Sequence, residues 1–332
     1  MLGYSETATD RSNTSMKNPS SPTLKQQLAY AMPSIGVLFL MGPMSIIQGI
    51  YAKYFGVTLA VIASVVLMAR LFDVVTDPLI GYFSDRMTAR TGSRKPFIVW
   101  GGLLLVVSSY FLFIPVNPNQ IDANTQVSTL YFALSFLGLY LGFTLYEIPH
   151  QSWGAVLSSN SEGRNTIFGL RAAAGTSGLL LFYAVPLLPL FESRAFTPQT
   201  LQWSVLIAGA LLLPALFFCI KNTPDRCGIQ TNLTKKDVQR NLDTNRPNKE
   251  TSTAKVRQRR LLISMLLGNK SLLLFYAASA CYGLSMGAFY GLEFIFIDTY
   301  LGRGEDYALI NIAGTVAGLV SLFAWRKVVS VL

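Results

Sequence analysis

Three charged residues on an otherwise apolar segment are the strongest candidates for chemistry in this sequence. Arg70, Asp73 and Asp77 lie within the stretch RLFDVVTDPLIGYFSDR. On a helix, residues three, four and seven apart share one face, so these side chains form a single charged stripe. Two neighbouring carboxylates can offer oxygen ligands to one hard cation, and the arginine can balance their charge when the cation leaves. The pattern therefore predicts a cation site with an arginine beside it.

Two other interpretations of the stripe stay open. An ion pair between Arg70 and Asp73 that only holds helices together needs one acid, whereas the sequence supplies two. A proton can take the place of Na⁺ if burial favours the neutral form of one carboxylate. The residues alone do not decide between Na⁺ and H⁺.

The composition around the stripe is that of a polytopic membrane protein. The chain has 332 residues, of which 51% are hydrophobic and 13% are charged, whereas soluble domains carry about 25% charged residues. Apolar runs long enough to cross about 30 Å of hydrocarbon recur along the chain. We predict an all-α fold whose membrane spans lie at roughly 29–49, 58–83, 97–116, 128–156, 166–191, 202–220, 271–299 and 307–325.

The distribution of Lys and Arg sets the orientation of these spans. Basic residues gather in the polar N-terminal segment, in the loop after the second span and in segment 221–270, while the intervening loops hold few. Because basic loops are retained in the cytoplasm, we expect the N-terminus there. The net charge of +10 is then a topology signal. It calls for no nucleic-acid partner, and the bilayer is the expected surroundings of the protein.

Segment 221–270 also divides the chain into parts. Residues 1–28 are predicted to be a disordered cytoplasmic tail and 29–220 a six-helix bundle. Residues 221–270 are predicted to be a basic cytoplasmic loop and 271–332 the first two helices of a second bundle. Six helices, a long basic loop and further helices resemble the layout of the major facilitator superfamily, in which two bundles face each other across a central site.

The loop after the second span carries a motif that strengthens this resemblance. Gly81, the pair Asp85-Arg86 and the pair Arg94-Lys95 resemble the G-x-x-x-D-R-x-x-G-R-R signature of the superfamily, with a spacing longer by a few residues. The resemblance implies a cytoplasmic gate, in which the glycine permits close helix approach and the aspartate pairs with basic groups. A generic basic loop is the alternative.

A narrower resemblance comes from the stripe itself and from the fourth span. RLFDVVTDP from residue 70 and YEIP from residue 146 together resemble the glycoside–pentoside–hexuronide:cation symporter family. In that family two aspartates of the second helix and a threonine of the fourth bind the coupling cation, which implies a site at Asp73, Asp77 and Thr144. The implied function is Na⁺- or H⁺-coupled symport of a sugar-like small molecule across a bacterial inner membrane, without a cofactor.

Glu147 is the candidate substrate residue, because the sugar carriers of this family have an acid here that hydrogen-bonds sugar hydroxyls. Gln151 lies one helical turn further on and can join it. Trp153 can stack on a ring face of the substrate or anchor an interface. Arg171 can bridge to Glu147, bind the substrate, or extend its charged end to the membrane surface.

Three features depart from the family pattern. The sugar carriers have an acid on their first helix, whereas Leu38 occupies about that position here. A second expectation is therefore that the transported solute is amphipathic, such as a lysophospholipid. Complete members have twelve helices, so the resemblance implies a chain truncated after the eighth, and a non-transporting remnant is a third expectation. Glu293 in the seventh span is an acid that the resemblance does not place.

Enzymes and channels are less favoured than a transporter. His150 is the single histidine of the chain, which excludes an H-E-x-x-H zinc site. The G-x-S-x-G string at 283–287 lies in a predicted span, whereas a nucleophile elbow needs a strand-turn-helix context. Paired acids can also line a cation pore, and uptake that depends on a counter-ion would distinguish a symporter from such a channel. The sequence does not set the oligomeric state.

Overall fold

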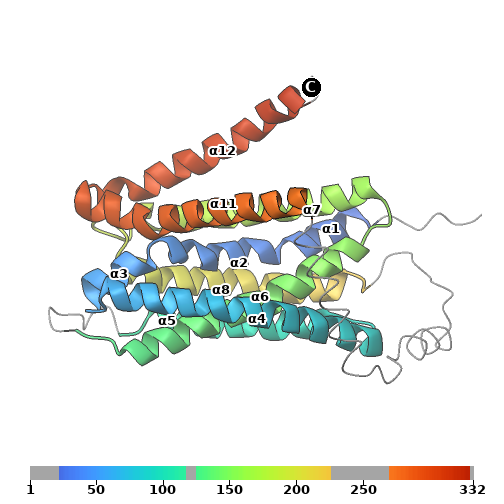
Figure 1. Ribbon diagram of the computed structural model, residues 1–332, viewed down its shortest axis with the longest axis horizontal. Helices are drawn as coiled ribbons and strands as arrows, with labels where there is room; N and C mark the ends of the chain where they lie inside the picture. The colour runs from blue at the N-terminus through green and yellow to red at the C-terminus, as the bar shows by residue number, and fades with distance from the viewer. Residues whose placement is uncertain (1–21, 117–124, 226–268, 330–332) are drawn as a thin grey trace, which may run out of the picture.

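The computed structural model describes residues 22–116, 125–225 and 269–329, and the side chains as far as residue 321. These residues form helices, and no strand occurs among them. The helices of the first six predicted spans lie side by side along one axis, and the helix nearest the C-terminus is inclined away from them (Figure 1). The predicted basic loop at 221–270 and the predicted tail at 1–28 lie mostly outside the described residues.

The first predicted span is a broken helix. A capping box made by Thr23 and Gln26 starts it at Leu24, so the helix takes in the last residues of the predicted tail. Pro33 and Pro43 then interrupt the backbone hydrogen bonding, because proline has no N–H to donate. The resulting pieces are α1 (Leu24–Ala31), α2 (Pro33–Met41), the 3-10 turn η1 (Gly42–Ser45) and α3 (Ile47–Tyr54).

The other five spans of the first bundle are continuous helices. They are α4 (Leu59–Thr91), α5 (Lys95–Phe113), α6 (Thr129–Val156), α7 (Ser161–Ala184) and α8 (Pro198–Asn222). The helix α4 runs eight residues past the predicted end at 83, because nothing breaks it before Gly92, which adopts φ 79°. Asp85 and Arg86 therefore lie on a helix, and the prediction that they follow the end of the span was wrong, whereas Gly81 lies on the helix within the predicted span 58–83.

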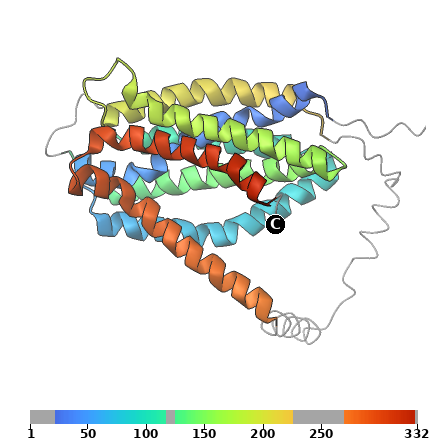
Figure 2. The same cartoon turned by 90° about the horizontal axis from the view of Figure 1, so that it is seen from above.

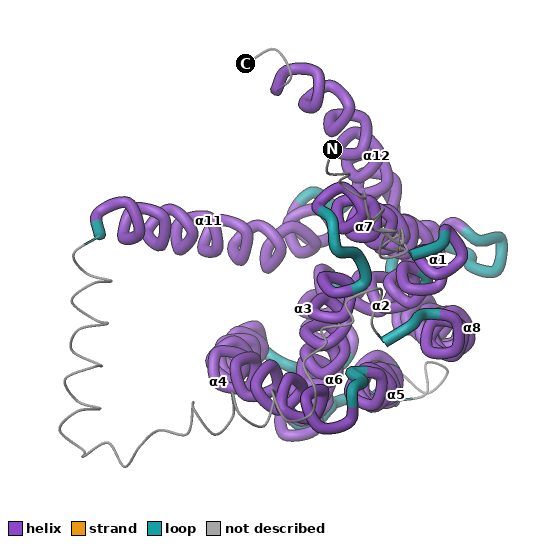
Figure 3. Tube along the Cα trace, turned by 90° about the vertical axis from the view of Figure 1, so that its right-hand side faces the viewer, coloured by secondary structure: helices purple, strands orange, loops and turns teal. Residues whose placement is uncertain are grey.

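The second part of the chain adds two long helices joined by short turns. They are α11 (Lys270–Ile295), the π-helical turn η4 (Phe296–Tyr300), the 3-10 turn η5 (Gly304–Asp306) and α12 (Tyr307–Val329). The helix α11 ends and α12 begins near the α3 end of the bundle, and the start of α11 lies apart from the first six spans at the other end (Figures 2 and 3).

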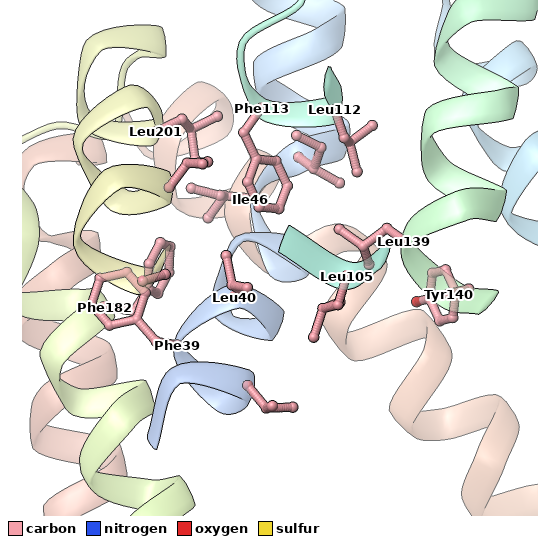
Figure 4. Close-up of a cluster of buried hydrophobic side chains, with 14 of the residues drawn as sticks. Phe39, Leu40, Ile46, Leu105, Leu112, Phe113, Leu139, Tyr140, Phe182 and Leu201 are labelled. Atoms are coloured by element: carbon pink, nitrogen blue, oxygen red, sulfur yellow. The ribbon is translucent and has the colours of Figure 1, made fainter. Parts of the chain in front are cut away.

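Close helix contacts and a buried apolar cluster hold the first bundle together. Gly101 of α5 lies against the backbone of Tyr146. A Cβ added at Gly142 of α6 would lie only 2.5 Å from the backbone nitrogen of Leu105. Small residues at such positions let two helix backbones approach. Large apolar side chains fill the space between the helices, as Figure 4 shows for Phe39 and its neighbours.

Length and hydropathy agree with a membrane-embedded bundle. Seven helical segments among the described residues are long and apolar enough to cross a membrane. The eighth predicted span corresponds to α12, whose last residues have no described side chains. The chain is therefore an all-α polytopic membrane protein, and its described residues hold six candidate spans in the first bundle and a seventh at Lys270–Tyr300.

Candidate functional site

Two contacts fix how α4 and α6 lie against each other. Near one end, the Arg70 Nη2 atom donates a hydrogen bond of 3.0 Å to the Tyr140 hydroxyl, and the guanidinium lies 4.7 Å from the centre of the Tyr140 ring. Further along, a Cβ added at Gly81 would lie 3.9 Å from the Cγ2 atom of Ile148. The two helices are separated by one span, so they cross the bundle in the same direction.

This register places the three predicted cation-site residues in neighbouring turns of α4 and α6. Residues 77 and 144 each lie one helical turn before the contact between Gly81 and Ile148, so Asp77 and Thr144 are at the same level of the bundle. Asp73 lies one turn before Asp77, where Arg70 contacts both Asp73 and Tyr140. Thr144 is buried, with 6% of its surface exposed. The predicted site would therefore lie between α4 and α6 and would need both helices.

The carboxylates of this site have unused hydrogen-bonding capacity. Asp73 Oδ2 lies 3.5 Å from Arg70 Nη1, which is a long ion pair. The Oδ1 atoms of Asp73 and Asp77 are both buried and lack a hydrogen-bond partner among the described residues. A buried oxygen without a partner is costly unless a ligand or ion satisfies it. Two such oxygens on one helix face suit Na⁺, or a proton shared with the carboxylates.

Arg70 connects the cation site to a central cavity. The cavity has a volume of about 640 Å³ and lies between the first bundle and α11. Arg70 is the one charged residue among the described residues of its wall. The polar residues there are Ser45, Gln48, Tyr140, Tyr183 and Tyr290. The remaining wall is mainly apolar, with Leu38, Met41, Met44, Phe136 and Met286 among its residues. This space is large enough for a small organic solute.

A second polar cluster surrounds Glu147, near the other end of α6. Arg171 of α7 forms an ion pair with Glu147 through Nη2 and Oε1. Gln151 donates a hydrogen bond of 2.6 Å to the same Oε1 atom. The Oε2 atom of Glu147 is buried without a hydrogen-bond partner among the described residues. Of the roles that the sequence left open for Arg171, this conformation shows the bridge to Glu147.

His150 holds the guanidinium of Arg171 from the other side. Its Nε2 atom lies 3.0 Å from the Tyr30 carbonyl oxygen, and its Nδ1 atom lies 3.3 Å from Arg171 Nε. Because a carbonyl only accepts and a guanidinium only donates, the imidazole must be neutral with its proton on Nε2. The ring is fully buried and stacks on Tyr30 and Tyr146, with centroid distances of 4.2 and 4.9 Å.

Trp153 is separated from the cavity by this packing. It is 1% exposed, and its indole N–H donates a hydrogen bond of 2.9 Å to the Pro224 carbonyl oxygen. The Lys95 ammonium lies 5.6 Å from the centre of its ring. In this conformation Trp153 presents no face to a ligand and anchors the end of α8 to α6.

The residues of the predicted gate motif form a local ion-pair network. Arg94 Nη2 lies 2.7 Å from Asp85 Oδ1, and Lys95 Nζ lies 3.5 Å from Asp225 Oδ2. These contacts tie α4, α5 and the segment after α8 at one end of the bundle. Arg86 takes no part in them, since its described hydrogen bond goes to the Tyr82 hydroxyl at 3.0 Å.

The opposite end of the molecule holds contacts that the sequence analysis missed. Lys53 Nζ at the end of α3 lies 3.0 Å from Asp298 Oδ2 in η4. Phe294 packs against Gly49, and Glu305 accepts a hydrogen bond of 2.9 Å from Ser193. No short-range pattern links residues so far apart in the chain. Tyr140, in contrast, was accessible to sequence reasoning, because it lies one turn before Thr144 on the same face of α6.

Glu293 is placed by the structure near α12. It is half-buried on α11, and the side chains of Asn311 and Tyr307 of α12 lie near it. Phe294 and Tyr307 also meet edge to face, with ring centroids 5.1 Å apart. Glu293 therefore belongs to the contact between the two helices of the second part and does not line the central cavity.

The fold is that of a helical membrane protein with a cavity between two groups of spans and buried charges beside that cavity. This is the architecture of a secondary transporter. The family model described as MFS/sugar transport protein matches residues 29–332. The chain belongs to this family of the major facilitator superfamily, and it is an integral membrane protein and a transporter by family, not an enzyme.

Curated relatives are similar to this chain over about half of their own length or less. An uncharacterized symporter of Bacillus subtilis, YnaJ, is 26% identical over 230 residues, which are 66% of this chain and 46% of that protein. The isoprimeverose transporter of Lactiplantibacillus pentosus is 26% identical over 57% of this chain and 38% of its own length. The lactose permease of Lactobacillus delbrueckii subsp. bulgaricus is 23% identical over 79% of this chain and 39% of its own length. The chain spans about half the length or less of these relatives.

Proposed function

We propose that this chain forms the cation-binding half of a symporter for a sugar, a glycoside or a related small organic solute. The observation that supports this proposal most directly is the pair of buried carboxylate oxygens at Asp73 and Asp77, which lack hydrogen-bond partners among the described residues. The names of relatives as symporters and as transporters of isoprimeverose and lactose support this substrate class. Residues 29–220 are proposed as one complete bundle and 271–332 as the start of its partner.

Arg70 links ion and substrate in the proposed mechanism. It lies between the aspartate pair and the cavity, with one nitrogen near Asp73 and another on Tyr140. A cation bound at Asp73, Asp77 and Thr144 would weaken the attraction between Asp73 and Arg70, which would leave the guanidinium freer to contact a solute. Two ligands that favour the same arrangement of Arg70 raise each other's affinity, which is the thermodynamic basis of coupling.

Glu147, Gln151 and Arg171 are proposed to bind substrate hydroxyls at a different stage of the cycle. Glu147 keeps one carboxylate oxygen without a partner among the described residues, and Arg171 offers further N–H donors beyond the one on Glu147. Neither residue lines the central cavity in this conformation. Trp153 is proposed as an interface anchor, because it is buried against Pro224.

The orientation of the bundle is proposed from the basic residues, with the N-terminus in the cytoplasm of a bacterial cell. The ends of α4 and α5 that carry Arg86, Arg90 and Arg94 then face inward. The contacts between Lys53 and Asp298 and between Gly49 and Phe294 lie at the outer end. Because α11 lies apart from the bundle at the proposed inner end (Figure 2), we infer that this conformation is closed on the outside.

An amphipathic solute is the second candidate substrate. The wall of the central cavity includes Met41, Met44 and Met286, and methionine adapts to irregular apolar shapes. The first helix contributes Leu38 where sugar carriers have an acid. Competition between a short-chain glycoside and a lysophospholipid for uptake into cells that express the full-length protein would separate the two classes.

Asp77→Asn is expected to abolish stabilisation of the purified chain by sodium. A ligand that binds the folded state at one hundred times its Kd stabilises it by about 2.7 kcal/mol, and the variant loses one carboxylate of the site. The measurement is thermal unfolding in detergent, with NaCl compared with choline chloride at equal ionic strength. Asp85→Asn is the matched control, because it makes the same change on the same helix at an exposed carboxylate.

The outcomes of this experiment separate the coupling ions. A sodium shift that Asp77→Asn retains would contradict the proposed site. A shift with pH that takes the place of the sodium shift and disappears in Asp77→Asn would make H⁺ the coupling ion. A chain that responds to neither ion would refute the proposal that this half binds the cation.

Lys53→Glu is expected to open the outer end of the molecule. The substitution places two negative charges at the position of the Lys53–Asp298 ion pair, where the lysine is 48% exposed. Partly exposed pairs contribute roughly 0.2–1 kcal/mol, which corresponds to an increase of about 1.4- to fivefold in the open population. The rate at which an impermeant maleimide labels a cysteine at position 48, in a chain without other cysteines, measures the change. The charge swap of Lys53→Asp with Asp298→Lys should restore slow labelling. Equal labelling rates in all variants would contradict a role of the Lys53–Asp298 ion pair in closing the outer end.

A further inference from the structure

A second cavity lies on the flank of the first bundle, away from the central one. It has a volume of about 570 Å³ and forms where α4 meets α5 and α6 near the basic end of the bundle. We call it the flank groove. It is lined by Ile80, Phe83, Arg86, Met87, Arg90, Phe97 and Leu145.

The flank groove and the central cavity use different lengths of α4. Val66 and Arg70 line the central cavity, whereas the α4 residues of the flank groove begin at Ile80, more than two helical turns past Arg70, and end at Arg90. Phe83, Arg86 and Arg90 are exposed, and α5 and α6 contribute the rest of the wall. The flank groove therefore opens away from the central cavity, and we expect lipid to meet it in a membrane protein.

Two arginines without an acidic partner stand at this groove. Arg86 and Arg90 are exposed and lie one helical turn apart. The nearest acid in sequence, Asp85, is engaged by Arg94 at 2.7 Å. Arg86 donates a hydrogen bond to the neutral hydroxyl of Tyr82. Among the described residues, neither Arg86 nor Arg90 forms an ion pair with a carboxylate, so both positive charges remain available to a ligand.

The apolar walls and the two positive charges of the flank groove together favour one class of ligand. Isoleucine, phenylalanine, methionine and leucine side chains offer an apolar surface that suits an acyl chain. The two guanidinium groups, one turn apart, suit a phosphate, since arginine binds phosphate oxygens through paired N–H donors. A free phosphate would leave the apolar walls unused, and a lipid without net charge would leave the arginines uncompensated.

We propose that the flank groove binds an anionic phospholipid, with its phosphate on Arg86 and Arg90 and an acyl chain along Ile80, Phe83 and Phe97. The site is independent of the proposed cation site. Only the assignment to the cytoplasmic leaflet rests on the proposed orientation, because basic residues near a membrane surface attract anionic lipids in that leaflet. The bound lipid would fill the space between α4 and the α5–α6 pair.

The test is lipid binding to the full chain measured by native mass spectrometry in detergent. Phosphatidylglycerol and phosphatidylcholine are titrated separately. Each arginine near a lipid surface contributes roughly a fivefold increase in affinity, so Arg86→Gln with Arg90→Gln should weaken phosphatidylglycerol binding about thirtyfold and leave phosphatidylcholine binding unchanged. Arg90→Gln alone, which removes no described hydrogen bond, gives the same test without a risk to folding.

A matched control removes the same charge elsewhere on the basic side. Arg164→Gln with Lys221→Gln changes the net charge equally but leaves the groove intact, and should retain the wild-type preference for phosphatidylglycerol. Equal loss in this control would mean that bulk charge attracts the lipid, and would overturn the site. Retention of binding in the Arg86 and Arg90 variants would overturn it as well. Full competition by glycerol 3-phosphate would show a phosphate site that needs no lipid.

Discussion

Glu147→Ala and Arg171→Ala are each expected to destabilise the folded chain by more than the double variant does. The two side chains form an ion pair in which each is only 16% exposed. Removing one partner leaves the other charge buried and uncompensated, which costs about 3–5 kcal/mol, whereas removing both leaves no buried charge. Gln151 and His150 also bond to this pair, so each single loss disturbs a wider network than the pair alone.

A double-mutant cycle on thermal or denaturant unfolding in one detergent measures this effect. Asp85→Ala and Arg94→Ala provide the control cycle, because Asp85 is 67% exposed in its ion pair with Arg94. Exposed pairs contribute about 0–1 kcal/mol, so the control variants should be nearly additive. Additive destabilisation at Glu147 and Arg171 would contradict the interpretation of this pair as a buried, coupled charge network.

Gly101→Ala is expected to disrupt the bundle, although alanine normally favours a helix. An added Cβ at Gly101 would overlap the backbone nitrogen of Tyr146 on α6, and a backbone cannot move aside as a flexible side chain can. Overpacking of this kind costs about 1–3 kcal/mol or more. Gly142→Ala should act in the same way, because its added Cβ would lie 2.5 Å from the backbone nitrogen of Leu105.

At two control glycines we expect the change in stability to have the opposite sign. Nothing lies within 4 Å of an added Cβ at Gly169 or Gly283, so alanine there should be neutral or stabilising by roughly 0.5–1 kcal/mol, since it reduces backbone entropy in the unfolded chain. The fraction of monodisperse protein after size-exclusion chromatography and the midpoint of thermal unfolding report both effects. Equal behaviour at Gly101 and Gly283 would mean that α5 and α6 are not in backbone contact.

Most spans followed from composition, because a membrane segment must be long, apolar and helical to satisfy its own backbone hydrogen bonds. This requirement is local, and it predicted α6 at 128–156 against an observed Thr129–Val156. The end of α4 was wrong because that boundary lies outside the apolar run. There the helix stops where Gly92 takes a positive φ, and hydrophobicity carries no information on that position.

The family resemblance and the charged stripe were visible in the sequence, because spacings of three, four and seven residues place side chains on one helix face whatever surrounds them. Arg70, Asp73 and Asp77 were therefore recognisable as one group. Glu147 and Gln151, one turn apart on α6, were accessible for the same reason.

Contacts between helices were decided only by the tertiary structure. The register that puts Asp77 and Thr144 at the same level depends on how α4 packs on α6, and the pairing of Arg171 with Glu147 depends on the approach of α7. The Lys53–Asp298 ion pair joins residues 245 positions apart, and the flank groove needs three helices at once. Helical periodicity fixes which residues share a face, but the partner of each face is set by packing over the whole bundle, where backbone approach at residues such as Gly101 decides which helices can meet.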